Sequence, residues 1–403
     1  MNLSFYTSFN TSLAQQEAQI NTLQQQISTG LAVQTPDQNP AAYQAAALGN
    51  DQISALANNS NTQAAIQVQL GSVSNAYQAT GSLLNSVQSV VEQALNGTTS
   101  PQNLNALAGQ VQSAAHQMLA LANTTASNGT YLFGGSRGSV APFQSSGSGS
   151  IIYMGDGAQS QAAITPNTTA STIANGEVFV SGLAGDGTGS VTAAASNIGT
   201  GQLISQGVSN AAAAAAFQSG SSAITVSFGA GGAYTASQGG SAVASGTLTS
   251  NTTTGTNTVQ LGGVDYQITG TPAAGDSFTL SPSRPQSAFA LLQTIYKALA
   301  SAVSTPSQMA QTNQVLNQGL AGLAQYQQNV VTAQAQNGVT LQAITNAGTS
   351  NTNQSTQIQT AVQNATAVNT PLAITNLDQT LTALQAAMKT FGTVQSLSLF
   401  NYV

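Results

Sequence analysis

Each end of this chain carries a narrow apolar stripe at heptad spacing that has no partner beside it in the sequence. Near the start the stripe is broken only by Gln16, and its members are Tyr6, Phe9, Leu13, Ile20, Leu23 and Ile27. Near the end its members are Ile374, Leu377, Leu381, Leu384, Met388 and Phe391. Such a narrow stripe, with a period of roughly 3.5 residues, is typical of a coiled-coil seam rather than of a helix on a thick globular core.

We therefore expect the first helix to pair with the last, or both helices to pair with copies in neighbouring subunits. Because neither stripe has a globular core to bury against, we expect residues 1–35 and 370–403 to become ordered on assembly. Pairing of the two ends within one chain is the alternative. Either arrangement favours an assembling structural protein over an enzyme.

Charged residues are scarce along the whole chain. The 403 residues include four basic and ten acidic ones, about 3% of the total, where soluble domains carry roughly 25%. The polar surface must therefore be built from Gln, Asn, Ser and Thr. Four basic residues cannot neutralise a row of phosphates or form a polybasic membrane patch, which excludes nucleic-acid binding and membrane-surface binding. With so few titrating groups, the fold should also be nearly indifferent to acid and salt.

Cysteine and targeting signals narrow the function further. The chain has no cysteine, which removes disulfides, thiolate catalysis and most zinc sites. The start shows no basic segment followed by an apolar one, so we expect no cleaved signal peptide. No apolar run is long enough to span a bilayer. The chain is then either cytoplasmic or exported by a route that needs no such signal, and the missing cysteine fits export unfolded as well as compositional bias.

Helical periodicity occupies both ends of the chain, and a β-rich segment separates them. After Pro40 and again after Pro101, apolar residues recur at helical spacing, and the pattern returns after Pro285 and Pro306. The last of these stripes contains the polar residues Gln327 and Asn337. The fold class is therefore mainly α with an inserted β-rich domain, and the N- and C-terminal segments form a long coiled-coil-like bundle. We divide the chain into a first assembly helix (1–38), the N-terminal bundle part (39–135), the inserted outer domain (136–285), the C-terminal bundle part (286–369) and a last assembly helix (370–403).

Short β-type runs mark the inserted domain. We expect strands at residues 151–153, 178–180 and 224–228. The clearest hairpin joins residues 258–261 to 264–268 through Gly262-Gly263, because two glycines supply the positive φ angles of a tight turn. Between the strands we expect long loops that include the low-complexity run 211–216.

No constellation of residues indicates catalysis, a cofactor or a metal. The single histidine, His116, lies about 200° around a helix from the apolar stripe, so we expect it on the surface. The acidic residues are scattered, with no two within one helical turn, and no glycine cluster matches a phosphate-binding loop. A hydrolase carried in the middle domain is the enzyme alternative.

Three motifs resemble the bacterial flagellin superfamily, and its hook-associated protein 3 branch in particular. The first is Ile27-Ser28-Thr29-Gly30-Leu31-Ala32-Val33 followed by Pro36-Asp37-Gln38-Asn39-Pro40, similar to the turn between the first two helices of that family. Leu31 stands where a basic residue is usual, and Asn39 replaces one of the usual acids. The second is Asn128-Gly129-Thr130-Tyr131-Leu132-Phe133-Gly134-Gly135 with Ala141-Pro142-Phe143. The third is the chain end, Ser396-Leu397-Ser398-Leu399-Phe400-Asn401-Tyr402-Val403, and Gly275-Asp276-Ser277-Phe278-Thr279-Leu280 also recurs in the family.

The resemblance implies a structural role in the bacterial flagellum, outside the cell. It implies that the chain is exported unfolded by the flagellar type III apparatus with an export chaperone. It also implies a ring of identical subunits between hook-associated protein 1 and flagellin, with the terminal helices inside and the β-rich domain facing outward. The predicted assembly interface takes most of the two terminal stripes and adds the two apolar residues near the chain end. Its members are Tyr6, Phe9, Leu13, Ile20, Leu23, Ile27, Leu377, Leu381, Leu384, Met388, Phe391, Leu399 and Phe400. The alternatives are a flagellin, a subunit like hook-associated protein 1, and a surface adhesin stalk.

Overall fold

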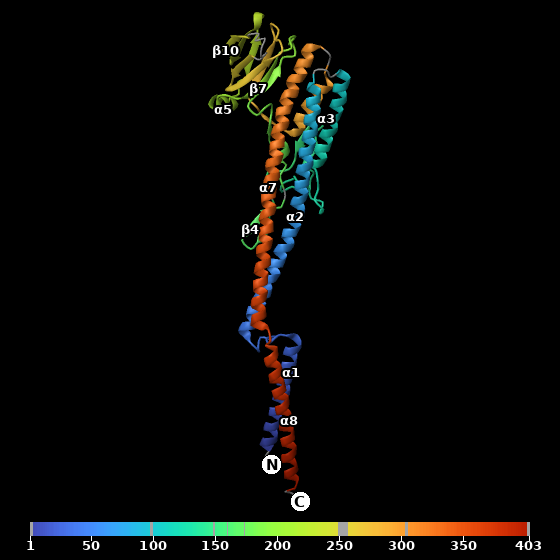
Figure 1. Ribbon diagram of the computed structural model, residues 1–403, viewed down its shortest axis with the longest axis vertical. Helices are drawn as coiled ribbons and strands as arrows, with labels where there is room; N and C mark the ends of the chain where they lie inside the picture. The colour runs from blue at the N-terminus through green and yellow to red at the C-terminus, as the bar shows by residue number, and fades with distance from the viewer. Residues whose placement is uncertain are drawn as a thin grey trace. The chain divides into compact units, whose positions relative to one another are not determined.

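The computed structural model describes the backbone of residues 3–96, 100–147, 150–158, 160–172, 174–248, 257–302 and 305–400. The helices are α1 (Leu3–Thr29), α2 (Pro40–Leu95), α3 (Pro101–Ala122), α4 (Glu177–Val180), α5 (Ala211–Ser219), α6 (Ala288–Ala300), α7 (Pro306–Thr366) and α8 (Thr370–Phe400), with one 3₁₀ turn, η1 (Ala230–Gly232). The strands are β1 (Phe143–Ser145), β2 (Ile151–Tyr153), β3 (Gln161–Thr165), β4 (Thr168–Ser171), β5 (Gly182–Leu183), β6 (Ser190–Ala193), β7 (Gln202–Val208), β8 (Ile224–Phe228), β9 (Ala233–Gln238), β10 (Ser241–Thr247), β11 (Asn257–Leu261), β12 (Val264–Thr269), β13 (Ser277–Ser281) and β14 (Pro285–Gln286). The predicted fold class, helical at both ends with a β-rich insert, is confirmed (Figure 1).

The chain divides into two compact units whose limits fall within the long helices. The first unit comprises Met1–Thr62, Ile164–Asn167 and Asn346–Val403, and the second comprises Gln63–Ala163 and Thr168–Thr345. These limits differ from the five predicted segments, which were drawn at changes of residue pattern. The compact units group residues by spatial contact, whereas the predicted segments group them by residue pattern. The helices α2 and α7 each continue unbroken from one unit into the other.

The helical part of the second unit has a continuous apolar core. The predicted stripes of α2 and α3 supply Val73, Leu84, Val91, Leu104 and Val111, each no more than 1% exposed. The start of α3 follows the expected chemistry, because the Ser100 side chain accepts a hydrogen bond from the Asn103 N–H and Pro101 occupies the first turn. Against these helices pack α6 and the first half of α7.

The second family motif fills this core with aromatic rings. Phe133 and Phe143 are 0% and 2% exposed, and both rings lie edge-on to Phe179, at centroid distances of 5.2 and 5.4 Å. Phe143 also packs against Phe289 of α6 at 5.3 Å. Edge-to-face pairs at these distances add to the stability that apolar burial provides. The second family motif thus packs buried aromatic rings against α4 and α6.

Two antiparallel sheets of the insert share a second core. The strand order is β10-β9-β8-β13-β6 in one sheet and β11-β12-β7 in the other. Val226 and Phe278 from the first sheet meet Tyr266 and Ile268 from the second in one buried cluster. The predicted hairpin is confirmed as β11–β12, with φ angles of +56° and +80° at Gly262 and Gly263.

Two of the predicted local structures in the insert are wrong. Residues 178–180, predicted as a strand, form the helix α4, where Val178 and Phe179 are buried in succession and so do not follow the alternation of a strand. Residues 211–216, predicted to lie in a loop, begin the helix α5. Alanine is the strongest helix former, and the Asn210 side chain caps the helix by accepting from the Ala213 N–H.

Side-chain amides join separate elements by pairing at two points with a backbone peptide group. The Gln314 amide accepts from the Leu203 N–H and donates to the Leu203 carbonyl, both at 2.7 Å. In the same way Asn123 pairs with Phe143 at 3.0 and 2.8 Å, and Asn197 pairs with Ser277 at 2.8 and 2.9 Å. Gln318 pairs with Val191 in the same manner. Each amide thus bonds both backbone groups of one residue, as a neighbouring strand would.

The polar interruptions in the α7 stripe also have partners on α2. The Asn337 amide, 8% exposed, donates to the Leu70 carbonyl at 2.9 Å. Gln327 donates to the side-chain oxygens of Asn85 and Gln88 at 2.7 and 2.9 Å. These hydrogen bonds fix the register of the two helices where an apolar pair would not.

We predict that Gln314→Leu lowers the free energy of unfolding by about 2–3 kcal/mol, because it leaves the Leu203 N–H and carbonyl buried without partners. Gln314 is 1% exposed, whereas Gln328 on the same helix is exposed. Gln328→Leu is therefore the matched control, and its effect should stay within about 0.5 kcal/mol. Urea denaturation of the three proteins checks this, and equal effects of the two substitutions would contradict it.

We also predict that the fold tolerates acid but not alkali. Burial raises the pKa of Tyr77, Tyr266 and Tyr326 above the ordinary 10.0. Above about pH 10 the unfolded chain therefore loses these phenol protons first, and stability falls as pH rises. On the acid side, hydrogen bonds from Ser136 lower the pKa of Asp156, so its contribution is present above the ordinary 3.8 and is lost as pH falls further.

Melting temperature should accordingly stay level from pH 8 to about pH 4 and decline above about pH 10. Tyr266→Phe should reduce the alkaline decline, and Tyr43→Phe, at a side chain that is 40% exposed, should leave it unchanged. A fall of tens of degrees between pH 7 and about pH 4 would refute the acid half of this expectation.

Candidate assembly interface

The first and last helices lie side by side in the first unit, with the start of α1 and the end of α8 at the same end of the pair (Figure 1). The pairing within one chain, which the sequence left open as an alternative, is the arrangement in this structure. Phe391 of α8 stacks on Phe9 of α1 at a centroid distance of 4.2 Å and an interplanar angle of 8°. The Tyr6 ring meets the same phenylalanine edge-on at 5.3 Å.

The pair covers its apolar stripes only in part. Ile20 and Leu23 of α1 are each 8% exposed, and Ala373 of α8 is 4% exposed. The predicted residues Phe9, Leu13, Ile27, Leu377, Leu381, Leu384 and Phe391 are half-buried. Tyr6 is 37% exposed and Met388 is 50% exposed. Leu399 and Phe400 were also predicted in this interface, and their side chains lie outside the described residues.

Two apolar side chains outside the predicted interface are also open to solvent. Leu372 is 56% exposed and Ile374 is 45% exposed, both near the start of α8. Ile374 was part of the predicted stripe, and its exposure shows that the stripe turns away from α1 at this end. A helix pair buried along a complete seam would not leave such residues open.

The polar break in the first stripe weakens the pair. The Oε1 atom of Gln16 is buried and has no hydrogen-bond partner in the described part of the chain. A buried acceptor without a partner costs about 1–3 kcal/mol. The α1–α8 pair is therefore less stable than its aromatic contacts alone would make it.

The first family motif forms the connection between these helices and the rest of the first unit. Gly30 ends α1 with a φ of +73°, the left-handed conformation that glycine adopts without strain. The chain then runs antiparallel to the segment that follows α7. The Ala32 N–H donates to the Thr366 carbonyl at 2.7 Å, and the Val368 N–H donates to the Gly30 carbonyl at 2.9 Å. The two connections are thus tied together by backbone hydrogen bonds.

Both helices beyond this tie begin with the same cap. The Asn39 side chain accepts from the Ala42 N–H at 3.1 Å at the start of α2, and the Asn369 side chain accepts from the Leu372 N–H at 3.2 Å at the start of α8. An uncharged asparagine caps a helix as well as aspartate does. The departure at Asn39 from the usual acid therefore keeps the cap while removing a charge.

Close packing of α2 on α7 completes the first unit and was missed in the sequence. A Cβ atom added at Gly49 would lie 2.4 Å from the Val362 Cγ2 atom, so only glycine allows the two helices to approach this closely. Gly49 and Val362 are 313 residues apart in the 403-residue chain, and nothing local in the sequence marks them as neighbours.

The described residues do not form a metal centre, and His116 is exposed as predicted. No described helix combines the length and apolarity that a membrane crossing requires. The interface itself contains few charges, so apolar contact and ring stacking dominate it.

Comparison with known proteins agrees with the motifs. The family model of the bacterial flagellin N-terminal helical region matches residues 2–137. Flagellar hook-associated protein 3 of Escherichia coli K12 is 36% identical over 123 residues, which are 30% of this chain and 38% of that protein. The chain thus matches less than half of the length of this curated relative.

Solved structures match over more of the chain. A crystal structure of FlgL from Xanthomonas campestris superposes with a TM-score of 0.65 and 30% identity, covering 73% of this chain and 94% of that one. The flagellar junction protein FlgL from Legionella pneumophila superposes with a TM-score of 0.64 and 25% identity, covering 73% and 96%. Identity at this level over nearly the whole of these structures, joined to the motifs at both helical ends, places the chain in the flagellar hook-associated protein 3 (FlgL) family.

Proposed function

We propose that this protein joins the flagellar hook to the flagellin filament as a structural subunit that assembles through α1 and α8. The observation that carries the proposal is the incomplete burial of the α1–α8 seam, with Met388, Leu372 and Ile374 about half exposed. Apolar side chains in a row on a terminal helix gain stability when neighbouring copies cover them. The assembly interface is the predicted set of residues from Tyr6 to Phe400.

The same proposal includes the partners. Copies of the chain form a ring, hook-associated protein 1 lies on one side of it, and flagellin lies on the other. The chain leaves the cell unfolded by the flagellar type III apparatus, with an export chaperone, and the β-rich domain faces outward. Membership of the FlgL family supports these partners, and so does the scarcity of charge, because the contacts between copies must then be apolar or made by amides. The role is structural rather than catalytic.

The proposal is tested by deletion and complementation in cells that make this protein. Cells without it should shed flagellin into the medium and lack filaments in electron micrographs. Filaments that stay attached in the deletion strain would favour the adhesin-stalk alternative and contradict a junction role.

Met388→Gln should impair complementation at least several-fold, measured as filaments per cell, while leaving the melting temperature of the monomer unchanged. The reason is that Met388 is 50% exposed in the single chain, so about half of its surface is open to contacts with neighbouring copies, and glutamine keeps the length of the side chain. Gln385→Ala, at an exposed position on the same helix, is the control and should complement fully. Full complementation by both variants would contradict the proposed interface.

The free monomer should lose both terminal helices first in limited proteolysis. The α1–α8 pair has few buried side chains and one buried acceptor without a partner, so it opens more readily than the second unit with its two cores. Chymotrypsin is the suitable protease, because Tyr6, Phe9 and Phe391 lie on these helices while the chain has only four basic residues for trypsin. Intact-mass measurements should show cleavage at both ends before any cleavage within Gln63–Ala163. Termini that last as long as the second unit would count against this.

A further inference from the structure

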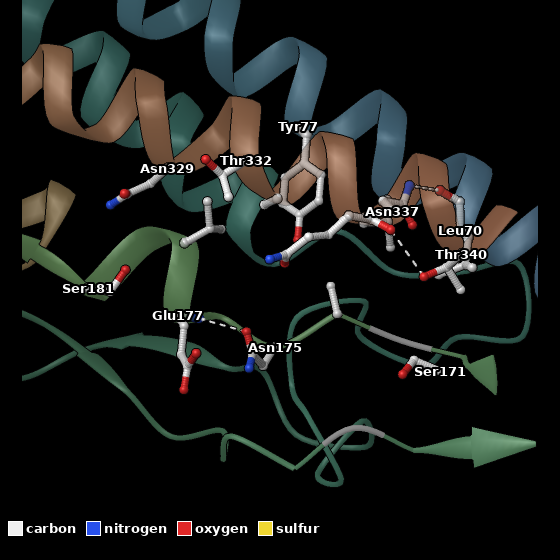
Figure 2. A pocket seen from close by; sticks show the side chains of 15 residues that line it. Leu70, Tyr77, Ser171, Asn175, Glu177, Ser181, Asn329, Thr332, Asn337 and Thr340 are labelled. Carbon is white, nitrogen blue, oxygen red and sulfur yellow. Dashed lines mark hydrogen bonds between the residues drawn. The ribbon is translucent and has the colours of Figure 1, made fainter. Parts of the chain in front are cut away.

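A cavity of about 370 Å³ lies in the second unit, between α2, α7 and the segment from β4 to α4 (Figure 2). Its size falls in the range of small-molecule sites. Nothing in the proposed junction role uses it, because none of its residues belongs to α1 or α8.

The floor of the cavity contains a buried tyrosine, Tyr77, whose hydroxyl makes no hydrogen bond with the residues that the structure describes. Tyr77 is 4% exposed, and burial raises its pKa. No hydrogen bond from the described residues reaches its hydroxyl, which points from α2 into the cavity (Figure 2). This hydroxyl is therefore available to bond a molecule that enters the cavity.

The other two buried tyrosines, Tyr266 and Tyr326, differ from Tyr77 in their surroundings. The Tyr326 hydroxyl accepts from the Gly182 N–H at 3.1 Å, and it also donates to the Gln286 carbonyl. The Tyr266 hydroxyl is buried and has no hydrogen-bond partner among the described residues, but it borders a much smaller space of about 70 Å³. Tyr77 differs from both, because its hydroxyl faces a cavity that admits a larger molecule.

The lining combines an apolar floor with a polar rim. Leu70, Val73 and Val178 of the floor are buried. Asn329, Gln336 and Ser181 of the rim carry amide and hydroxyl groups that both donate and accept hydrogen bonds. This arrangement matches a ligand that has an apolar face surrounded by hydroxyl groups.

The charges of the lining residues restrict the chemical class of the ligand further. No basic residue lines the cavity, so it offers nothing to neutralise a phosphate or a carboxylate. Its only carboxylate belongs to Glu177, which is exposed and points away from Tyr77 (Figure 2). A cationic head group near Tyr77 would therefore meet only neutral groups.

We propose that this cavity binds a small neutral polyhydroxylated molecule with the chemistry of a hexose ring. The ring's apolar face lies on Val73 and Val178, and one of its hydroxyl groups bonds to the Tyr77 hydroxyl. Asn329 and Gln336 bond to further hydroxyl groups at the rim. No residue of the site belongs to the terminal helices, so the proposed ligand binding can be tested separately from the junction role.

The test is saturation-transfer NMR titration of the full-length protein with three probes: methyl glucoside, methyl mannoside and methyl galactoside. At least one should bind saturably below about 50 mM, with the same affinity at low and high salt because no charge is involved. Methyl glucuronide, added as a charged comparison, should bind more weakly than methyl glucoside. No saturable binding of any of the three glycosides, or stronger binding of a neutral Gly-Ser peptide, would overturn the proposal.

Two variants separate a binding role from a structural one. Tyr77→Phe should weaken the binding about fivefold and leave the melting temperature equal or higher, because it removes a hydroxyl that the fold leaves unpaired. Tyr296→Phe, at a half-buried tyrosine outside this cavity, is the matched control and should bind as the original protein does. A lower melting temperature in Tyr77→Phe would show that the fold uses the hydroxyl, and Asn329→Ala with unchanged affinity would show that the rim does not bind; either result would overturn the site.

Discussion

The structure of the second unit depends on neutral amide side chains that pair with backbone peptide groups. Each of four Asn or Gln residues bonds both the N–H and the carbonyl of one residue far away in the sequence, as Gln314 does with Leu203. The pairs hold α7 to β6 and β7, α3 to β1, and the loop after β6 to β13. Where a sheet edge would otherwise face a helix with its peptide groups unpaired, the amide satisfies both groups at once.

This device suits a chain with about 3% charged residues. In most proteins, ion pairs and charged caps would share this task, but here amides and backbone groups perform it. The one charged side chain buried in the described residues follows the same rule. Asp276 is 1% exposed and has backbone rather than a cation around it, accepting from the Ile198 and Ala273 N–H groups at 2.8 Å. The family motif Gly275-Asp276-Ser277 therefore ties a loop by hydrogen bonds to a carboxylate.

The periodicity of the sequence predicted local elements, the helices and the hairpin. The contacts between residues far apart in the sequence depend on the three-dimensional fold and were not predicted. The stripes of α2, α3 and α6 and the Gly262-Gly263 hairpin follow from spacing and turn chemistry alone. Residues 178–180 were misread because a run of apolar β-type residues has the same local signal in a strand and in a single buried helical turn. The segment Tyr131–Phe143 was recognised as a family motif. Its packing in the core could not be predicted, because Phe143 contacts Phe289 of α6, which lies more than 140 residues later in the sequence.

The candidate interface shows the same limit. The apolar stripes predicted the residues of the interface. Which of these residues are covered depends on the angle between α1 and α8, and that angle cannot be predicted from residue type. Leu372 and Ile374 follow the Asn369 cap at the start of α8, close in sequence to the backbone tie, and both are exposed. The amide–backbone pairs and the close approach of α2 to α7 at Gly49 could not be predicted, for a related reason. Nothing in the local sequence around a glutamine on a helix face, or around a glycine within a helix, indicates a distant partner.

The contrast between the two units follows from where apolar area is buried. The second unit has two cores of its own, so its stability does not require another chain. In the first unit the α1–α8 pair is held by two aromatic contacts, a few buried aliphatic side chains and a tie of two backbone hydrogen bonds, and it contains the unpaired Gln16 acceptor. The mutual surface of this pair does not cover its apolar side chains completely, because Leu372, Ile374 and Met388 remain about half exposed. Under the proposed function, helices from neighbouring copies of the chain bury this remaining apolar area.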